Sequence, residues 1–250
     1  MRVILRLQSN KNIKQKELFL KYHHTMHGFV YSKITDSEAF KTLHKKQEFK
    51  PFSFGNLFPV KEETIKEGEN YSIVISSPIP KFIEELFFSI TPGEVMNIGE
   101  ASFMILEQQI KQIRLKNNSI IENISPINLT KHENNTIKSL KFGESNYVEQ
   151  LRENLIKKYN QYNKEKIEND FRLFENIEIK PNEKRKEASF PIYFFNKGKN
   201  EYFNVIGSKL IFKLNNISEK QLKILQFCFD LGFGERTSYG AGFMVERWKK

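Results

Sequence analysis

Residues 231–242, near the end of the chain, combine four glycines with an arginine, two hydroxyl side chains and a tyrosine. Glycine adopts positive φ and lets a ligand come close to the main chain, so the N–H groups of such a segment can converge on an anion. Arg236 adds a planar, forked cation that suits phosphate. This glycine loop therefore predicts a binding site for phosphate groups. The residues expected to form the site are Gly232, Gly234, Arg236, Ser238, Tyr239, Gly240 and Gly242.

Two nucleotide-binding motifs do not fit the glycine loop. The dinucleotide fingerprint, G-x-G-x-x-G, lies between a strand and a helix, whereas the spacing here is G-x-G-x5-G-x-G and a helical pattern precedes it. A Walker loop ends in Gly-Lys followed by serine or threonine, but Gly198-Lys199 is followed by asparagine. These departures disfavour a nucleotide-binding metabolic enzyme. A glycine-rich turn without a ligand stays open as an alternative.

Histidines cluster in one predicted helix. His24, His27 and Tyr31 are spaced i, i+3 and i+7 and so share a face, which would place an imidazole beside a phosphate. His23 and His27 also have the i, i+4 spacing of two metal ligands, but the segment lacks the glutamate of the zincin motif and no third ligand is evident. We therefore expect no metal and no cofactor. Packing alone also explains a tyrosine on such a helix.

The balance of charge favours an anionic partner. The chain has 40 basic and 30 acidic residues, a formal net charge of +10 and a pI near 9.4. A basic cluster surrounds a predicted hairpin and would hold an RNA duplex through its phosphates, since A-form RNA is recognised largely by shape and backbone. A solvated basic hairpin is the alternative. The cluster consists of Lys180, Lys184, Arg185 and Lys186, with Lys197 and Lys199 beyond.

Cysteine content and hydropathy indicate the compartment. Cys228 is the single cysteine, which excludes a disulfide within the chain. The N-terminus lacks the apolar region of a signal peptide, and no apolar run approaches the roughly 18 residues of a membrane span. We expect a soluble, cytoplasmic protein.

Hydrophobic periodicity gives the same order of elements in both halves. Apolar alternation and helical spacing predict strands over residues 2–8, 52–58, 71–76 and 102–115, and helices over residues 14–34, 35–46 and 80–90. The second half predicts strands near residues 127 and 137 and over residues 171–179, 189–195, 202–214 and 243–248, with helices over residues 146–162 and 218–231. Capping boxes begin the helices at Thr35 and Ser218. The polar stretch over residues 157–170 is interpreted as a solvated helix end and loop.

These elements indicate an α+β chain with two tandem ferredoxin-like βαββαβ units. Ser125-Pro126, almost at the midpoint, is interpreted as the linker. The expected domains are residues 1–124, with the reactive groups, and residues 125–250, with the glycine loop.

With these motifs in this order, the chain resembles the RAMP proteins of CRISPR systems and, among them, the sixth Cas family, whose members cut repeat transcripts into guide RNAs. The resemblance extends over nearly the whole chain, and the glycine loop is its most specific part. Family members commonly end this loop with Gly-Phe-Gly, whereas Gly240-Ala241-Gly242 lacks the aromatic ring. The other matching segments are the opening strand, residues 22–31, Pro51-Phe52-Ser53-Phe54, Ser76-Ser77-Pro78 and Ser125-Pro126.

The resemblance also implies a catalytic site. Tyr31, His44 and Lys50 match the tyrosine, histidine and lysine of archaeal-type members, and His24 and His27 are rivals to His44. RNA supplies its own nucleophile, the 2′-hydroxyl, so a base, an acid and a cation suffice. A histidine titrates near neutral pH and Lys50 is a mobile cation, but the acid and base are not assigned between Tyr31 and His44.

The expected function is metal-independent cleavage of CRISPR repeat RNA, leaving 2′,3′-cyclic phosphate and 5′-hydroxyl ends. The expected partners are repeat RNA and guide RNA, with subunits of a type I interference complex, and the chain would act as a monomer or homodimer. The alternative is a non-catalytic RAMP subunit that grips guide RNA and has no need of His44 or Lys50.

Overall fold

The computed structural model describes residues 1–35, 37–43, 48–133, 136–182, 189–196 and 201–247. The chain folds into two compact units. Unit 1 comprises Met1–Gln112, Tyr193–Asn204 and Ser238–Gly240, whereas unit 2 comprises Ile113–Ile192, Val205–Thr237 and Ala241–Lys250. Of the described helices, none is long and apolar enough to cross a membrane.

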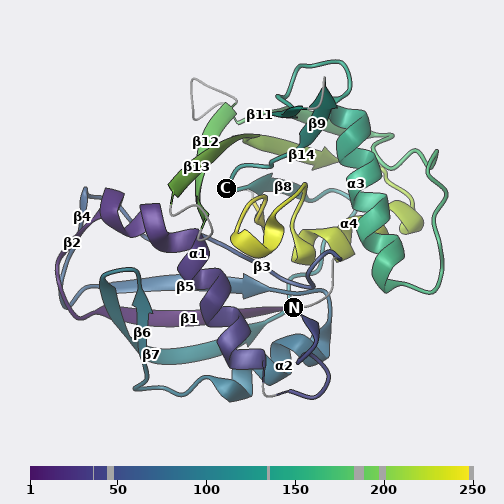
Figure 1. Cartoon of the computed structure of the whole chain (residues 1–250). Helices are drawn as coiled ribbons and strands as arrows, with labels where there is room; N and C mark the ends of the chain where they lie inside the picture. Colours follow the sequence, from purple (N-terminus) through teal and green to yellow (C-terminus); the bar gives the residue numbers. More distant parts are fainter. Residues whose placement is uncertain (36, 44–47, 134–135, 183–188, 197–200, 248–250) are drawn as a thin grey trace. The chain divides into compact units, whose positions relative to one another are not determined.

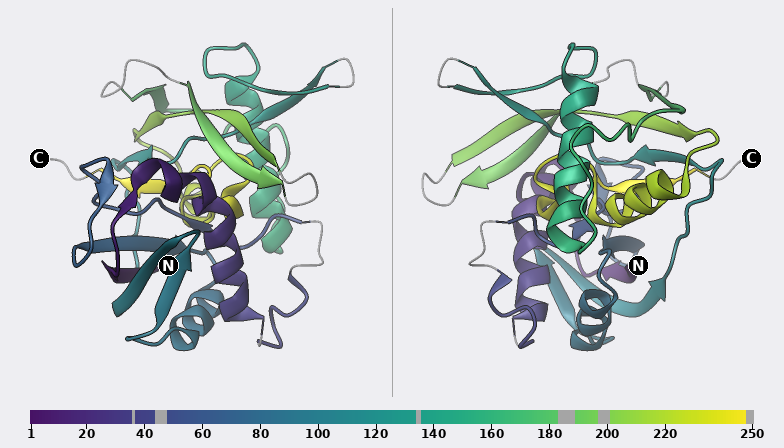
Figure 2. Two further views of the ribbon diagram at one scale, coloured as in Figure 1. Left: turned by 60° about the vertical axis from the view of Figure 1, so that its left-hand side comes forward. Right: turned by 90° about the vertical axis from the view of Figure 1, so that its right-hand side faces the viewer.

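Unit 1 is built on a five-stranded antiparallel sheet in the order β3-β5-β1-β7-β6. Helices α1 and α2 both contact this sheet and each other, and they lie on the same side of it (Figures 1 and 2). The strands are β1 (Arg2–Ser9), β3 (Ser53–Phe54), β5 (Asn70–Ser76), β6 (Val95–Ile98) and β7 (Ala101–Lys111); the helices are α1 (Gln15–Ile34) and α2 (Pro80–Ser89). A separate small sheet pairs β2 (Ile13–Lys14) with β4 (Thr64–Ile65).

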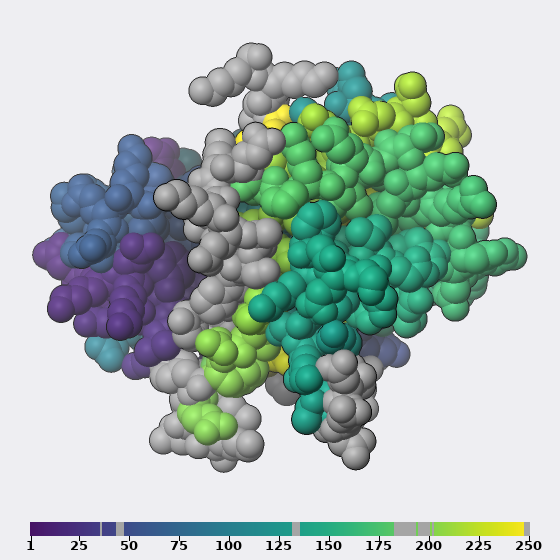
Figure 3. Space-filling view, turned by 90° about the horizontal axis from the view of Figure 1, so that it is seen from above, coloured from purple at the N-terminus to yellow at the C-terminus, as the bar shows by residue number. Residues whose placement is uncertain are grey.

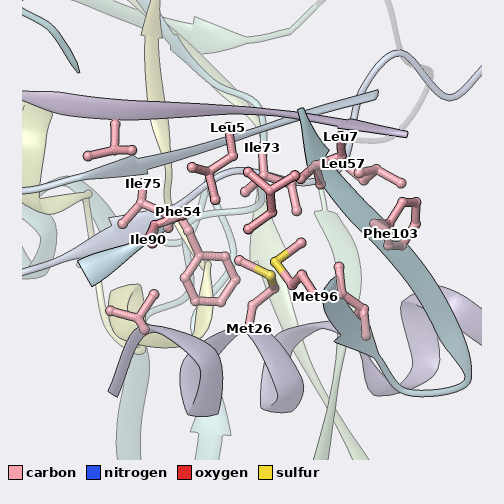
Figure 4. Close-up of a cluster of buried hydrophobic side chains, with 14 of the residues drawn as sticks. Leu5, Leu7, Met26, Phe54, Leu57, Ile73, Ile75, Ile90, Met96 and Phe103 are labelled. Atoms are coloured by element: carbon pink, nitrogen blue, oxygen red, sulfur yellow. The ribbon is translucent and has the colours of Figure 1, made fainter. Parts of the chain in front are cut away.

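The core of unit 1 fills the space between sheet and helices. The alternation of Val3, Leu5 and Leu7 on β1 buries all three side chains, as the sequence predicts. Figure 4 shows Met26 of α1 among side chains of the sheet, including Leu5 and Ile73. Burial of apolar area at roughly 25 cal/mol per Å² makes this interface the main stabilising contribution to the unit.

Unit 1 departs from the predicted elements in several places. The strand expected over residues 52–58 is limited to β3, the one expected over residues 102–115 ends at Lys111, and β2 and β4 were not expected. The helix expected over residues 35–46 is not formed by its described residues, which make turns: Thr35 is the helical C-cap of α1 and not an N-cap. The strand expected to begin at residue 102 is preceded by a strand that was missed, β6, whose chain reverses at Gly99 with φ of 61°. The local sequence pattern did not reveal these features. Whether a capping box starts a helix, and whether a short edge strand forms, both depend on the tertiary packing around the segment.

Unit 2 repeats the topology of unit 1. Its four-stranded antiparallel sheet has the order β11-β14-β8-β15, so its first strand, β8, lies between β14 and β15 as β1 lies between β5 and β7 in unit 1. The elements are β8 (Ile120–Asn123), α3 (Tyr147–Tyr162), β11 (Ile177–Pro181), β14 (Leu210–Leu214), α4 (Glu219–Leu231) and β15 (Met244–Glu246). One hairpin, β9 (Thr130–Glu133) with β10 (Thr136–Ser139), is added to unit 2. A second hairpin, β12 (Ser189–Asn196) with β13 (Glu201–Ser208), belongs to both units, because Tyr193–Asn204 is part of unit 1.

Unit 2 has its own core, to which α3, α4 and the sheet contribute. Side chains of the segment from β9 to β11, teal to green in Figure 3, form much of the surface of this unit in that view. The capping box at Ser218 is formed as predicted: Gln221 donates its backbone N–H to the Ser218 side chain, and its own side chain accepts from the Ser218 N–H. Leu225 and Phe229 of α4 are buried, whereas Leu222 is half-buried.

Several expectations for the second half of the chain need correction. The strand expected over residues 202–214 is two strands, β13 and β14, which belong to different sheets. The first strand of unit 2 is β8 and not a strand at residue 127, so Ser125 and Pro126 follow that strand inside the unit. The polar stretch over residues 157–170 is not simply solvated, because Lys158 is completely buried. The strand expected over residues 171–179 begins only at Ile177. The overall prediction is nevertheless confirmed: the chain is α+β, with two tandem ferredoxin-like units.

Candidate active site

One row of α1 carries three polar aromatic side chains at a spacing of four residues, namely His23, His27 and Tyr31. The adjacent row, with Leu18, Tyr22, Met26 and Val30, is buried in the core of unit 1. Residues four apart lie about one turn apart on the same face of a helix. Because the apolar row is packed into the core, the helix cannot rotate, and the direction of the polar row is fixed. Residues 238–240 of the glycine loop, which are part of unit 1, meet this polar row.

His23 is a buried anchor for the loop. Its Nδ1 lies 2.7 Å from the carbonyl oxygen of Tyr239, and only 8% of the residue is exposed. Burial lowers the pKa of His23 to about 4, against an opposing contribution from the Tyr239 carbonyl. The imidazole is therefore neutral at neutral pH, and because a carbonyl only accepts, Nδ1 carries the proton and donates it.

His27 makes the same kind of bond but is half-buried. Its Nδ1 lies 2.8 Å from the carbonyl oxygen of Ser238, and its ring stacks on that of Tyr239, with centroids 3.9 Å apart and planes 6° from parallel. The carbonyl again requires a proton on Nδ1, so neutral His27 keeps its lone pair on Nε2. An imidazole held in this tautomer is suited to act as a base at Nε2.

Tyr31 lies next to His27 on the same row. The two rings have centroids 4.7 Å apart, and Phe52 packs edge-on against Tyr31 at 5.7 Å. Burial raises the pKa of Tyr31 to about 12, and Tyr239 adds to the effect. The phenol therefore stays protonated near neutral pH and is suited to donate a proton or a hydrogen bond.

Of the other two predicted catalytic residues, the structure describes Lys50 but not His44. The Lys50 ammonium donates to the carbonyl of Leu43 at 2.7 Å, which puts this cation beside the residue preceding His44 in the chain. His44 itself lies outside the described residues. The catalytic roles of Tyr31, His44 and Lys50 stay predictions.

The grouping of histidines differs from the one expected. His24 is half-buried and lies one residue, about 100°, around α1 from His23, so the contacts to Ser238 and Tyr239 come from His23 and His27 instead. The i, i+4, i+8 spacing of His23, His27 and Tyr31 is visible in the sequence, but the spacing alone does not show which of the histidines contact the glycine loop. Among the described residues, no cluster of three or more His, Cys, Asp or Glu has the geometry of a metal site.

Phe194 was also missed. It is buried on β12, with its ring 5.7 Å from His23 and edge-on to Tyr239 at 5.9 Å. In a chain with 23 phenylalanines, nothing in the sequence distinguishes this ring from those of the core. Its contacts help to keep Tyr239 flat against His27.

Several N–H groups of the glycine loop are already bonded within the protein, while the role of the loop in binding phosphate stays a prediction. The N–H of Phe233 donates to Gly242, that of Gly242 to Pro126, and that of Glu235 to Asn128. The N–H groups of Gly232 and Ala241 are also bonded to carbonyls. These donors would have to break existing bonds before they could receive a phosphate.

The glycines are required by close approaches within each unit. A Cβ on Gly242, where φ is 63°, would lie 1.8 Å from the carbonyl oxygen of Phe233. A Cβ on Gly240 would lie 2.6 Å from the ring of Phe54 and 3.1 Å from Nδ1 of His23. Glycine at position 240 therefore lets the loop come close enough to accept the hydrogen bond from His23.

The predicted RNA contacts are partly placed. Arg236 is exposed, with a φ of 55° that points to a tight bend, and Tyr239 is half-buried against His27. Lys180 on β11 is half-buried and forms an ion pair with Glu178 at 3.9 Å. The rest of the basic cluster, Lys184, Arg185, Lys186, Lys197 and Lys199, lies outside the described residues.

Comparison with known proteins identifies the family. A family model described as "CRISPR associated protein Cas6, C-terminal" matches residues 107–246. Two curated proteins of Methanocaldococcus jannaschii, CRISPR-associated endoribonucleases Cas6 2 and Cas6 1, are 31% and 29% identical to the chain. The first alignment covers 96% of this chain and 98% of the relative, and the second covers 98% and 92%.

Solved structures agree with the sequence relatives. A structure titled "CRISPR associated protein Cas6" has a TM-score of 0.72 and 25% identity, and the match covers 99% of both chains. A structure titled "An RAMP protein binding different RNA substrates" also has a TM-score of 0.72, at 19% identity over 99% of this chain and 100% of the other. The resemblance drawn from the sequence is confirmed: the chain belongs to the Cas6 family of CRISPR-associated proteins.

Proposed function

We propose that this chain is a metal-independent endoribonuclease that binds CRISPR repeat RNA and cuts precursor transcripts into guide RNAs. The observation that carries the proposal is the fixed tautomer of His27, whose Nδ1–H is held by the Ser238 carbonyl while Tyr31 lies against its ring. A base with its lone pair on Nε2 and a protonated phenol are thereby adjacent. The curated relatives are named endoribonucleases, and the net charge of +10 suits an RNA substrate.

The reaction proposed is attack by the 2′-hydroxyl of the RNA on the adjacent phosphorus. The bond from O2′ to phosphorus forms, the bond from phosphorus to O5′ breaks, and the products carry a 2′,3′-cyclic phosphate and a 5′-hydroxyl. His27 accepts the 2′-hydroxyl proton at Nε2, and Tyr31 donates a proton to the departing O5′. Lys50 would stabilise the negative charge that develops on the phosphorane oxygens, and His44, an acid or a base as the resemblance implies, is the alternative to His27. The guide RNA would stay bound or pass to a type I interference complex.

The substrate would be held by Arg236 and Tyr239 on the loop and by the basic residues around Lys180. An exposed guanidinium binds phosphate through paired N–H groups, and an aromatic ring stacks on a base. Each phosphate contacted releases counterions, so affinity should fall steeply with salt, and the slope reports how many phosphates are engaged.

The test is incubation of the full chain with repeat RNA in EDTA. The expected result is one cut with a cyclic phosphate end, and no cut when a single 2′-deoxy nucleotide replaces the one before the scissile phosphate. Cutting that needs added Mg²⁺, or that proceeds on the 2′-deoxy RNA, contradicts the proposal. Tight binding without any cut by the wild-type chain would instead support the non-catalytic RAMP subunit.

A further inference from the structure

Lys158 of α3 is a completely buried lysine, and it contacts the glycine loop. Its ammonium donates to the carbonyl of Gly232 at 2.8 Å and also to the carbonyl of Gly234. All three residues belong to unit 2. The neighbouring Lys157 is exposed and pairs with Glu153, as expected for a lysine on a helix surface.

Burial of this ammonium disfavours its charged form. Desolvation lowers the pKa of Lys158 to about 7, and Cys228 on α4 and Glu235 on the loop act in the opposite direction. Lysine is almost never fully buried, and replacing a buried charge with a well-packed apolar side chain is often neutral or stabilising. The fold alone therefore does not account for a lysine here, whereas an ammonium can donate to two loop carbonyls at once.

The carbonyls that Lys158 holds are close in sequence to those that orient the histidines. Between them, Glu235 is fixed by its carboxylate, which accepts from the N–H and the hydroxyl of Thr130. Three residues beyond Glu235, the Ser238 carbonyl accepts from His27. The loop is thus held on one side of Arg236 by Lys158 and Glu235, and on the other by α1.

We propose that Lys158 is a positioning residue for the cleavage reaction: it sets the path of the glycine loop, and the loop presents the Ser238 carbonyl that keeps the proton of His27 on Nδ1. Lys158 has no contact with solvent, so we expect it to act through the loop and not by direct contact with RNA. Its effect on the cleavage rate rests on the proposed function, but its effect on the tautomer of His27 does not.

The first measurement needs no RNA. In the full chain labelled with ¹⁵N on histidine, NMR distinguishes the Nδ1–H from the Nε2–H tautomer, and loss of a signal in His27→Asn assigns it. The wild-type chain should show His27 with its proton on Nδ1 at pH 7.5. In Lys158→Met, an unbranched side chain of similar length without donors, the signal should move towards the Nε2–H form that exposed histidines favour. The matched control, Lys157→Met on the exposed side of the same helix, should leave it unchanged.

The second measurement is single-turnover cleavage of repeat RNA, together with the affinity for uncleavable 2′-deoxy RNA. A displacement of about 1 Å in a catalytic group costs on the order of 10²-fold in rate, so Lys158→Met should lose at least about tenfold. Its affinity for the RNA should stay within about threefold. Lys158→Gln keeps two N–H donors on a shorter side chain, so its rate and His27 signal should lie between those of Met and wild type.

The outcomes separate the two proposals. If Lys158→Met folds, cuts at the wild-type rate and keeps the Nδ1–H signal, Lys158 does not position the loop and the inference is wrong, although the proposed function survives. If the wild-type chain cuts no RNA but Lys158→Met alone shifts the His27 signal, the positioning role holds and the proposed function fails. If neither Lys158→Met nor Lys158→Gln gives a cooperative thermal transition, Lys158 serves stability and the positioning role is overturned.

Discussion

Helices α1 and α3 occupy the same place in two units of the same topology, and each donates side-chain N–H groups to carbonyls of the glycine loop. In unit 1 the donors are two imidazoles, His23 and His27, of which the second is half-buried. In unit 2 the donor is the ammonium of Lys158, which is completely buried. The same kind of hydrogen bond is thus made by a half-buried imidazole in unit 1 and by a completely buried ammonium in unit 2.

This difference implies different roles for the two units. His27 donates through Nδ1 and is half-buried, whereas the Lys158 ammonium has no contact with solvent. We therefore expect substitution of His27 on α1 to change chemistry with little loss of stability, and substitutions around the loop in unit 2 to act mainly through structure. The predictions below test this division in order of the expected effect.

The largest effect is expected for His27→Asn. The Asn side-chain N–H stands near the position of Nδ1–H and can still donate to the Ser238 carbonyl, but the Nε2 lone pair is lost. The rate of single-turnover cleavage should fall by about 10² to 10⁴, as for loss of a positioned base. The thermal midpoint should change little.

The matched control for this prediction is His23→Asn, which makes the same exchange one turn away. It should keep most of the cleavage rate because His23 is buried and acts only as an anchor. If His23→Asn and His27→Asn lose rate equally, the difference between the two imidazoles is not exposure of Nε2, and the base must be sought elsewhere, with His44 as the first candidate.

A smaller but still large effect is expected for Gly242→Ala in unit 2. The new Cβ would meet the carbonyl oxygen of Phe233 at 1.8 Å, and neither main-chain segment can yield without breaking the bonds between them. The unfolding free energy should fall by at least about 3 kcal/mol. Chemical denaturation measures it.

The control is Gly143→Ala, also in unit 2. Gly143 has a φ of 100°, but nothing lies within 4 Å of a Cβ there. Only the backbone strain remains, on the order of 1 to 2 kcal/mol. Equal losses in the two variants would show that φ, and not the close approach, requires glycine at position 242.

The sequence was informative wherever short-range pattern decides the structure. The alternation of Val3, Leu5 and Leu7 and the capping box of Ser218 both predicted what the structure shows, and the repeated order of elements predicted the fold. The site was only partly predictable: Tyr31 and His27 lie together as their i, i+4 spacing indicates.

The parts of the site that could not be predicted depend on contacts between residues that are far apart in the sequence. Lys158 follows another lysine in a polar stretch of helix, which predicts a solvated side chain. Nothing in the local sequence shows that two carbonyls of the glycine loop lie within hydrogen-bond distance of its ammonium. Likewise, the glycines of the loop indicate close approach, but the sequence does not say whether a ligand or the protein's own main chain comes close. In this loop it is largely the main chain, as Gly242 and Phe233 show.

The pH dependence of stability tests the buried imidazole of α1. His23 has a pKa of about 4 when folded and about 6.5 when unfolded, so between these values the unfolded chain binds more protons. The unfolding free energy should therefore fall as the pH drops from 6.5 to 4, by up to about 3 kcal/mol from this group. Denaturation of wild type and His23→Asn at pH 7, 5.5 and 4 should show the advantage of the wild type shrinking. Parallel curves for the two proteins would mean that His23 is not buried as a neutral group.

The smallest effect concerns the second helices of the two units, which begin differently. Helix α4 has the full capping box of Ser218 and Gln221, whereas α2 begins at Ile79-Pro80 without a side-chain cap. Ser218→Ala should lower the unfolding free energy by about 1 kcal/mol, and Ser218→Asp should restore it because a carboxylate caps as well and suits the helix N-terminus. Gln221 also donates to the carbonyls of Arg172, Leu173 and Glu175, so its side chain is held even without Ser218. If Ser218→Ala is neutral, these three bonds suffice to start α4, and the second helices of the two units begin on equal terms despite their different sequences.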